Sequence, residues 1–258
     1  MKKLIPLLLL LVSMPSLAQR QFDIEVIIFE RAVDAEKTSE SWPNTLPEID
    51  LERVGSFADA SYRQEKGVKM LDYSKYELTE QAQSLRDHAG FKVLLHKAWR
   101  QGDEGKRAAP VFHIQAGKDY SAKFNADGSE KVSDVDASPV EGVVEESIPQ
   151  PLYELDGKLQ IYVQHYLYAE TQLDIKKPSV REVKLEEKPL EVSGDLVEEE
   201  ATVVAGNMED VTPTVKVEEF LKSYRMEQKR RMRSTETHYL DHPLLGMIIQ
   251  VRRVEEQQ

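Results

Sequence analysis

Alternating hydrophobic and polar residues predict most of the regular structure of this chain. The first strand is predicted over residues 22–29, where apolar side chains occur on both faces. One face carries Phe22, Ile24, Val26 and Ile28, and the other carries Asp23, Glu25, Ile27 and Phe29. A strand that is apolar on both faces is typical of the middle of a sheet, so we expect a central strand here.

A helical pattern follows after a long connection, with apolar residues spaced by four, three and four positions. These residues are Leu78, Ala82, Leu85 and Ala89. We expect Thr79 to cap the start of this helix and Gly90 to cap its end. A second strand follows directly and is predicted to pack the helix back onto the sheet. Its apolar face would hold Phe91, Val93, Leu95 and Trp99, and its other face Lys92, Leu94, His96 and Arg100.

The most regular alternation begins after the turn signal Asp156-Gly157 and continues to about Glu170. One face, expected in the core, holds Leu159, Ile161, Val163, His165, Leu167 and Ala169. The opposite face is rich in tyrosines and amides and holds Gln160, Tyr162, Gln164, Tyr166, Tyr168 and Glu170. Core histidines that are satisfied by hydrogen bonds are commoner than metal-ligating ones, so His165 and His96 are interpreted as structural.

The C-terminal part predicts a closing hairpin, with one strand ending near Leu240 and the next running from Gly246 to Arg253. His238, Asp241 and His242 could supply metal ligands if this segment were helical. Pro243 and Gly246 favour a turn instead, so no metal site is predicted. The preceding residues 217–229 fit either a helix or a strand.

Together these elements predict a single α+β domain with an antiparallel or mixed sheet of about five strands and at least one packed helix. Two acidic segments are expected to interrupt it as flexible insertions. Residues 129–150 hold six acidic residues against one lysine, and residues 182–219 hold twelve against three, with no aromatic residue in either. Such low hydrophobicity and high charge cannot offset the entropy of ordering a chain.

The N-terminus predicts export. Lys2 and Lys3 precede an apolar run from Leu4 to Val12 and the small-x-small pattern Ser16-Leu17-Ala18, which is typical of a cleaved signal peptide. The run is too short to span a bilayer, although a retained anchor is the alternative. The signal peptide would cover residues 1–18 and the mature domain residues 19–258. Its removal takes the formal net charge from -12 to -14, which equals the sum of -5 and -9 in the two acidic segments. The remainder is therefore close to neutral.

Several classes of function have no support in this sequence. The chain has no cysteine, which excludes disulfides, thiolate metal sites and cysteine nucleophiles. Zinc-protease, serine-hydrolase and phosphate-loop motifs are missing, and no cofactor is predicted. The basic run from Arg225 to Arg233 is short, so nucleic acid is a poor candidate ligand for an exported protein. The acidic residues are numerous, so the sequence leaves open a pair of carboxylates spaced for glycoside cleavage, but no motif supports it.

Two patterns suggest ligand-binding residues. Tyrosines and amides on one strand face can stack on sugar rings and bind hydroxyl groups, although a half-exposed tyrosine face is also common in ordinary sheets. Arginines that stand out against an acidic chain suggest a surface for an anionic ligand. The candidates are Tyr162, Gln164, Tyr166, Tyr168, Trp42, Arg230, Arg231 and Arg233.

Five stretches spread over nearly all of the predicted mature chain carry a family resemblance. They are residues 25–30, 41–43, 94–101, 155–167 and 230–243. In this order they resemble the CsiV family of periplasmic peptidoglycan-binding proteins. The resemblance implies a periplasmic protein that binds the cell wall and supports its assembly and cell shape without enzymatic activity. It brings no assignment of site residues.

Peptidoglycan combines sugars with peptides that bear carboxylates, so the candidates divide by chemistry. We expect Tyr166 and Tyr168 to stack on sugars, and Arg230, Arg231 and Arg233 to pair with carboxylates. One alternative is an adaptor that contacts a cell-wall synthase or its activator without binding the wall. Another is a weak hydrolase with two converging carboxylates.

Overall fold

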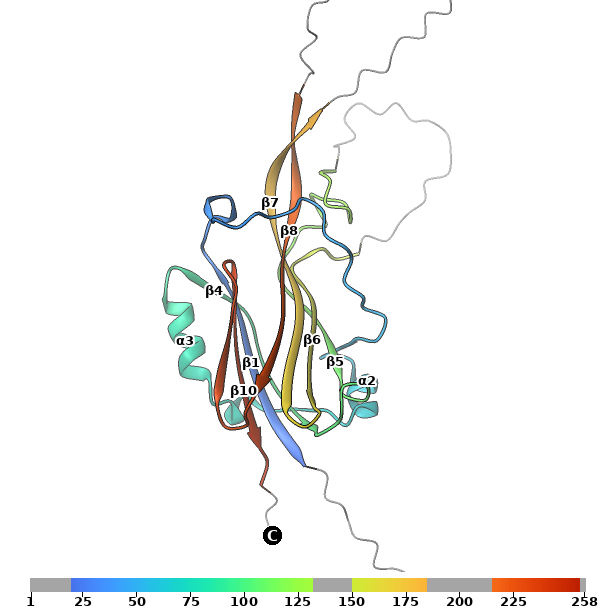
Figure 1. Ribbon diagram of the computed structural model, residues 1–258, viewed down its shortest axis with the longest axis vertical. Helices are drawn as coiled ribbons and strands as arrows, with labels where there is room; N and C mark the ends of the chain where they lie inside the picture. The colour runs from blue at the N-terminus through green and yellow to red at the C-terminus, as the bar shows by residue number, and fades with distance from the viewer. Residues whose placement is uncertain (1–19, 132–149, 185–214, 256–258) are drawn as a thin grey trace, which may run out of the picture. The chain divides into compact units, whose positions relative to one another are not determined.

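The computed structural model describes residues 20–131, 150–184 and 215–255. These residues form two five-stranded sheets (Figure 1), accompanied by the short helix α2 (Ala60–Glu65), the helix α3 (Thr79–Asp87) and two 3-10 turns. The predicted packed helix is present. The predicted α+β class fits only loosely, because the described residues are mostly β and form two five-stranded sheets where the sequence predicted one.

Contacts divide the chain into two compact units. Within the described residues, the first unit contains 20–119, 153–176 and 223–255. The second contains 120–131, 150–152, 177–184 and 215–222. The second unit has a small core of its own, formed by Tyr120, Phe124 and Leu221.

The first sheet has the order β3-β4-β1-β10-β9. Its strands are β1 (Gln21–Arg31), β3 (Lys69–Met70), β4 (Phe91–Gly102), β9 (Thr237–Asp241) and β10 (Leu245–Arg253). β1 pairs antiparallel with both β4 and β10, which confirms the predicted central strand. The predicted closing hairpin is also confirmed, because β9 and β10 are antiparallel neighbours.

The second sheet has the order β2-β5-β6-β7-β8. Its strands are β2 (Gly55–Ser56), β5 (Val111–Asp119), β6 (Tyr153–Val163), β7 (Leu167–Lys184) and β8 (Val215–Met232). Residues 217–229, which the sequence left open between helix and strand, belong to β8. The short β2 runs parallel to β5, whereas β5, β6 and β7 are antiparallel neighbours.

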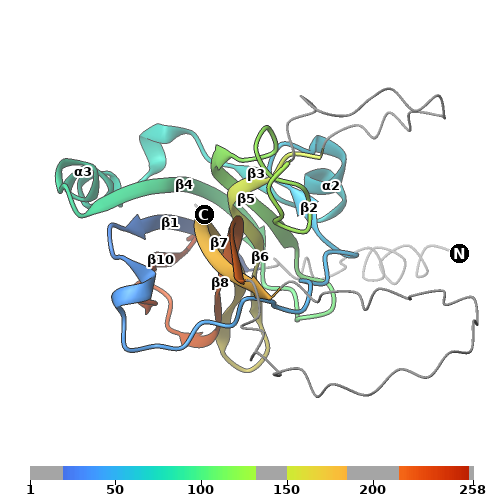
Figure 2. The same cartoon turned by 90° about the horizontal axis from the view of Figure 1, so that it is seen from above.

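The two sheets share the main core of the first unit. Figure 2 shows β1 and β10 on one side of this core and β5 and β6 on the other. Ile24 and Val26 of β1 belong to the same buried cluster as Leu159 of β6 and Leu173 of β7. Trp99 is buried in this cluster, as predicted. Its indole N–H donates to buried Gln101 at 2.7 Å, and the Gln101 amide donates to the Ile161 carbonyl of β6 at 2.8 Å.

Helix α3 covers the opposite face of the first sheet. Leu78 and Ala82 pack against Ile27 and Phe29 of β1 in a separate cluster, so the helix packs on the sheet as predicted. The predicted caps are wrong. Thr79 is the first helical residue and not the cap, and the C-cap is His88 in an extended conformation. Gly90 is not among the glycines with positive φ, so it makes no left-handed cap.

A β-bulge in β4 changes which side chains share a face. Ile28 pairs with Leu95 but Phe29 pairs with Val93, so Leu94 has no partner of its own on β1. Val93 therefore joins the cluster under α3, while Leu95 lies in the main core. The sequence pattern had placed both residues on one face, because a single inserted residue cannot be seen in an alternation.

The turn signal Asp156-Gly157 lies inside β6, so the predicted turn is wrong. Gly157 has φ +152°, and a Cβ there would lie 2.2 Å from the Gln172 carbonyl oxygen of β7. This glycine therefore marks a close approach between strands. The actual turn is at residues 164–166, which join β6 to β7. His165 is exposed in that turn and is not a core residue.

Some predictions fall on residues that the structure does not describe. The signal peptide at 1–18 lies outside the described residues, as do 132–149 and 185–214 of the two acidic insertions. The described ends of the second insertion, residues 182–184 and 215–219, belong to β7 and β8. No helix among the described residues is long and apolar enough to cross a membrane.

The buried carboxylate of Glu25 joins four parts of the first unit. It lies in the middle of β1 with none of its surface exposed. It accepts hydrogen bonds from the Leu78 N–H at the start of α3 (2.9 Å) and from Arg252 of β10 (3.0 Å), and it contacts His96 of β4 at 2.8 Å. His96 is thus a buried structural histidine as predicted, but only its Nε2 atom is satisfied, because its Nδ1 atom is buried without a hydrogen-bond partner in the described part of the chain. A buried charge is tolerated when it is paired and hydrogen-bonded in this way.

Replacing Glu25 should therefore destabilise the fold. We expect Glu25→Gln to lower the free energy of unfolding by about 3 kcal/mol, because it removes the buried carboxylate of the Glu25–Arg252 pair and leaves Arg252 only the exposed Glu77 as an ionic partner. Urea unfolding followed by circular dichroism measures this difference. Glu80→Gln, at an exposed position of α3, is the matched control and should change stability by less than about 0.5 kcal/mol. Equal stability of the two variants would contradict the role of Glu25.

The same network predicts an acid dependence. Burial acts most strongly on Glu25 and favours a higher pKa, but the hydrogen bonds from His96, Glu77, Leu78 and Arg252 outweigh it and hold the pKa below the ordinary 4.5. The stabilisation is therefore fully present above about pH 4.5 and is lost as the pH falls through the folded-state pKa. The stability difference between the wild type and Glu25→Gln should narrow in urea titrations taken from pH 7 to below 4.5. A constant difference would show that ionised Glu25 is not its source.

Candidate functional site

The outer face of the second sheet carries a polar trough. Alternate residues of each strand point into the core, so the intervening residues point away from it. Gln160 lies opposite Glu170, and Lys158 lies opposite Gln172, across β6 and β7. β8 adds Glu227 and Lys229 beside them. Segments from residues 50–54 and 105–108 complete a cavity of about 1030 Å³.

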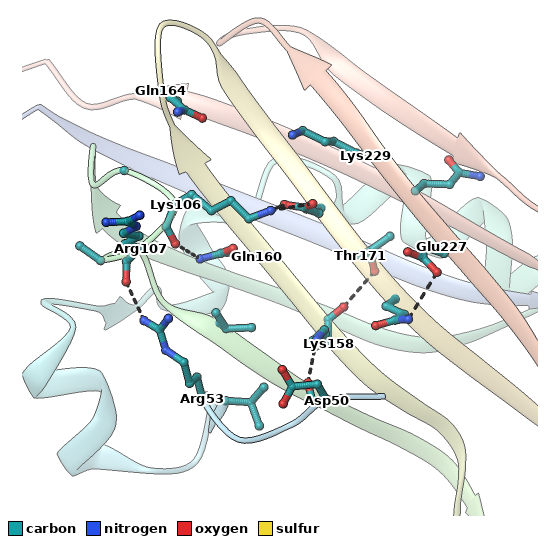
Figure 3. A pocket seen from close by; sticks show the side chains of 17 residues that line it. Asp50, Arg53, Lys106, Arg107, Lys158, Gln160, Gln164, Thr171, Glu227 and Lys229 are labelled. Atoms are coloured by element: carbon teal, nitrogen blue, oxygen red, sulfur yellow. Dashed lines mark hydrogen bonds and ion pairs between the residues drawn. The ribbon is translucent and has the colours of Figure 1, made fainter. Parts of the chain in front are cut away.

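Hydrogen bonds hold the segments that line this trough in place (Figure 3). The Gln160 amide donates to the backbone oxygens of Lys106 (2.7 Å) and Ala109 (3.2 Å), which fixes the loop after β4 to the sheet. The Lys158 ammonium donates to the Asp50 carbonyl at 2.6 Å. Arg53 donates to the Arg107 carbonyl at 2.8 Å. Three segments distant in sequence, β6 and residues 50–53 and 106–109, therefore form one lined surface.

The trough has an excess of positive charge. Its lining holds five cationic residues and three acidic ones. The cations are Arg53, Lys106, Arg107, Lys158 and Lys229, and the acids are Asp50, Glu170 and Glu227. Of these five cations, only Lys106 forms an ion pair within the described part of the chain. Its ammonium lies 2.6 Å from the Glu170 carboxylate. In a protein of formal net charge -12, this surface stands out as suited to an anionic ligand.

The charges nearer the other end of this sheet face neutralise each other. Burial favours a higher pKa for Asp156, but the hydrogen bond from His113 and the charge of Lys176 outweigh it and lower the pKa. The Lys176 ammonium lies 3.0 Å from that carboxylate. Arg225 and Asp174 make two hydrogen bonds of 2.8 Å, and these raise the pKa of the Arg225 guanidinium. These charges are therefore compensated by ion pairs within the described residues, in contrast to Arg53, Arg107, Lys158 and Lys229 of the trough.

The tyrosine face predicted from the sequence is formed, but its rings are covered. Tyr162 and Tyr168 lie opposite each other on β6 and β7, with their rings stacked 5.5 Å apart. Tyr162 is only 1% exposed. The Lys229 ammonium lies 5.1 Å from the centre of the Tyr168 ring, and the Lys106 ammonium lies 5.7 Å from that of Tyr162. These cation–π contacts occupy the surface that a sugar ring would need.

Gln164 and Tyr166 are in the hairpin turn between β6 and β7. Gln164 lines the trough, and Figure 3 shows its side chain at the hairpin end. Tyr166 is 54% exposed and lies outside the lining. The Arg231 guanidinium is 4.6 Å from the centre of the Tyr166 ring. The structure therefore pairs two of the predicted residues, Tyr166 and Arg231, beside the trough.

The three predicted arginines do not form one patch. Arg231 shares the outer face of β8 with Lys229, whereas Arg230 points to the opposite face because successive strand residues alternate. Arg233 lies beyond the end of β8 and pairs with Glu236 at 3.6 Å. Only Arg231 is therefore positioned next to the predicted tyrosines.

Comparison with known proteins identifies the family. The model of the CsiV family, described as "Peptidoglycan-binding protein, CsiV", matches residues 3–254. The chain belongs to the CsiV family. No curated protein and no solved structure matches it.

Trp42 has a structural position in this CsiV-family chain. Its ring lies 5.5 Å from the ring of Tyr224 and 5.3 Å from that of His242. Its indole N–H donates to the Thr38 hydroxyl at 3.0 Å, and the side chain packs against the main core. It is not part of the trough lining. Trp42 is therefore not brought together with the predicted tyrosines.

The residues between β9 and β10 also have structural roles. The His242 ring accepts a hydrogen bond from the Leu244 N–H at 3.2 Å, and burial is the main reason why the pKa of His242 lies below the ordinary 6.5. His238 contacts the backbone of Arg233. The described residues contain no group of three or more His, Cys, Asp or Glu side chains that could hold a metal ion.

Sequence reasoning missed most of the cationic lining. Lys158 and Lys229 occupy outward positions of β6 and β8, and the alternation around Gln160 could have indicated Lys158. Arg53, Lys106 and Arg107 are in connecting segments whose position depends on long-range hydrogen bonds. No local pattern marks them.

Trp42 provides a test of these placements. We expect Trp42→Ala to lower the free energy of unfolding by about 2 kcal/mol, less than the roughly 3–5 kcal/mol typical of fully buried aromatic residues, because Trp42 is only partly buried. Trp42→Phe should cost less, since it keeps a ring against Tyr224. Urea unfolding measures both changes. Loss of wall binding by folded Trp42→Ala, without a stability change, would instead make Trp42 a ligand contact.

Proposed function

We propose that this chain is a periplasmic protein that binds peptidoglycan through the trough on β6, β7 and β8 and supports cell-wall assembly and cell shape without catalysis. The observation that carries the proposal is a cation-rich polar trough in a chain whose family is described as peptidoglycan-binding. The predicted signal peptide at residues 1–18 would direct export and then be cleaved.

The chemistry of the trough supports this proposal. Peptidoglycan presents hydroxyls, amides and carboxylates, and the lining offers amides and cations to match them. The cavity is at the upper end of the roughly 300–1,000 Å³ range of small-ligand pockets. The cavity is therefore large enough for a short segment of the polymer.

The acidic residues of the lining favour binding over hydrolysis. Glycoside cleavage uses two carboxyl groups that face each other across the bond to be broken. Here the Glu170 carboxylate is engaged by Lys106, and Glu227 accepts a hydrogen bond from Gln172 at 3.3 Å. These contacts suit acids that shape and partly neutralise a binding surface.

Co-sedimentation with protein-free sacculi tests the proposed function. The mature protein should sediment with them and release no soluble fragments, and binding should weaken as salt rises because exposed charges are screened. Replacing Lys106, Lys158 and Lys229 together by Gln should weaken binding about tenfold or more, as expected for loss of charge-assisted hydrogen bonds.

The matched control removes the same charge elsewhere. Lys37, Lys69 and Lys97 are exposed and lie outside the trough, and their replacement by Gln should leave sedimentation unchanged. Release of soluble fragments would show that the protein hydrolyses the wall, which would contradict binding without catalysis. Absence of sedimentation at any salt concentration would overturn direct wall binding and would favour an adaptor that acts through a cell-wall synthase or its activator.

A further inference from the structure

The trough also indicates which part of the wall it recognises. Sugar-binding sites use open aromatic faces on which the rings stack. None of the residues that line this cavity is aromatic. The nearest candidates, Tyr162 and Tyr168, have lysine ammonium groups over their rings. The surface offered to a ligand is therefore formed by cations and amides instead of tyrosine rings.

The four lining cations that form no ion pair with the described residues come from both the floor and the border of the trough. Lys158 and Lys229 lie on the floor, on β6 and β8, and Arg53 and Arg107 belong to the connecting segments that border it (Figure 3). Their side chains form no ion pair within the described part of the chain. A ligand with several separated negative groups could meet more than one of them at once, and arginine can bind a carboxylate through two parallel hydrogen bonds.

Amide side chains supply the remaining hydrogen bonds. Gln164, Gln172 and Gln228 line the cavity along with the charged groups. An amide both donates and accepts, which matches the N–H and C=O groups of a peptide backbone. The Gln160 amide donates to two backbone oxygens, so it serves the framework. Gln172 donates to Glu227 and Gln228 to the Asp241 carbonyl, which leaves their amide oxygens as acceptors for a ligand. The Gln164 side chain makes no hydrogen bond within the described part of the chain. The available chemistry thus fits an extended, carboxylate-bearing peptide.

We propose that the trough binds the carboxylate-bearing stem peptides of peptidoglycan and not its glycan strands. This inference rests on the proposed function and deepens it. The carboxylates pair with Lys158, Lys229, Arg53 and Arg107, while the amides bind the peptide backbone. Tyr166, the exposed tyrosine beside the trough, is not required for this recognition.

Three soluble or solubilised probes separate the two parts of the wall. They are free stem peptides, the same peptides with their carboxylates converted to neutral methylamides, and glycan strands from which the peptides have been cleaved. Titration calorimetry at low salt, with the whole mature protein, should show binding of the free peptides. The neutralised peptides should bind at least tenfold more weakly, and the glycan strands should not bind.

Variants connect this recognition to the trough. Lys158→Gln with Lys229→Gln should weaken peptide binding about tenfold or more, whereas Lys37→Gln with Lys97→Gln removes equal charge and should leave it unchanged. Tyr166→Ala should also leave it unchanged. Circular dichroism of each variant verifies folding, and the single variants Lys158→Gln and Lys229→Gln replace the double variant if it does not fold.

The experiments distinguish an error in the stem-peptide assignment from an error in the proposed wall binding. If intact sacculi and glycan strands bind but free peptides do not, the stem-peptide assignment is overturned while wall binding stands. Loss of that glycan binding in Tyr166→Ala would place sugar recognition at the hairpin turn. If neither sacculi nor any of the three probes bind, the proposed function and this inference are both overturned.

Discussion

The first unit depends on a carboxylate buried in the middle of its central strand. Glu25 receives hydrogen bonds from the start of α3 and from β10, and contacts His96 of β4, so a single side chain fixes three strands and a helix relative to one another. An unpaired charge in this position would be costly, and the network therefore tolerates little change in register. With that sheet fixed, its other face can form one side of the main core.

The position of the trough follows from how the core is assembled. The first sheet is covered on one face by α3 and on the other by the second sheet, whose inner residues complete the main core. The outer face of β6, β7 and β8 is consequently where polar side chains gather. Hydrogen bonds from Gln160, Lys158 and Arg53 then bring two connecting segments to its borders. A binding surface is built without disturbing the core.

Local patterns were sufficient for some elements and misleading for others. Apolar residues on both faces correctly identified β1, and Pro243 and Gly246 correctly marked the β9–β10 hairpin. The bulge at Leu94, the close approach at Gly157 and the start of α3 all depend on contacts with distant segments. Thr79 has the chemistry of a cap, but the start of the helix is held by Glu25, which is more than fifty residues away in sequence.

The sequence likewise determined some features of the candidate site, and only the tertiary structure decided the others. The two-residue period of a strand determined by itself that Gln160 and Tyr162 share a face. That Tyr168 joins them depends on the register between β6 and β7. Composition determined that the chain has no thiol chemistry. Only the tertiary structure decided that lysines from β8 and from the loop after β4 lie over the tyrosine rings, and that Trp42 packs on Tyr224 and His242. The physical reason is that alternation records which side of its own strand a residue occupies, whereas the groups that cover it are supplied by segments brought close only by folding.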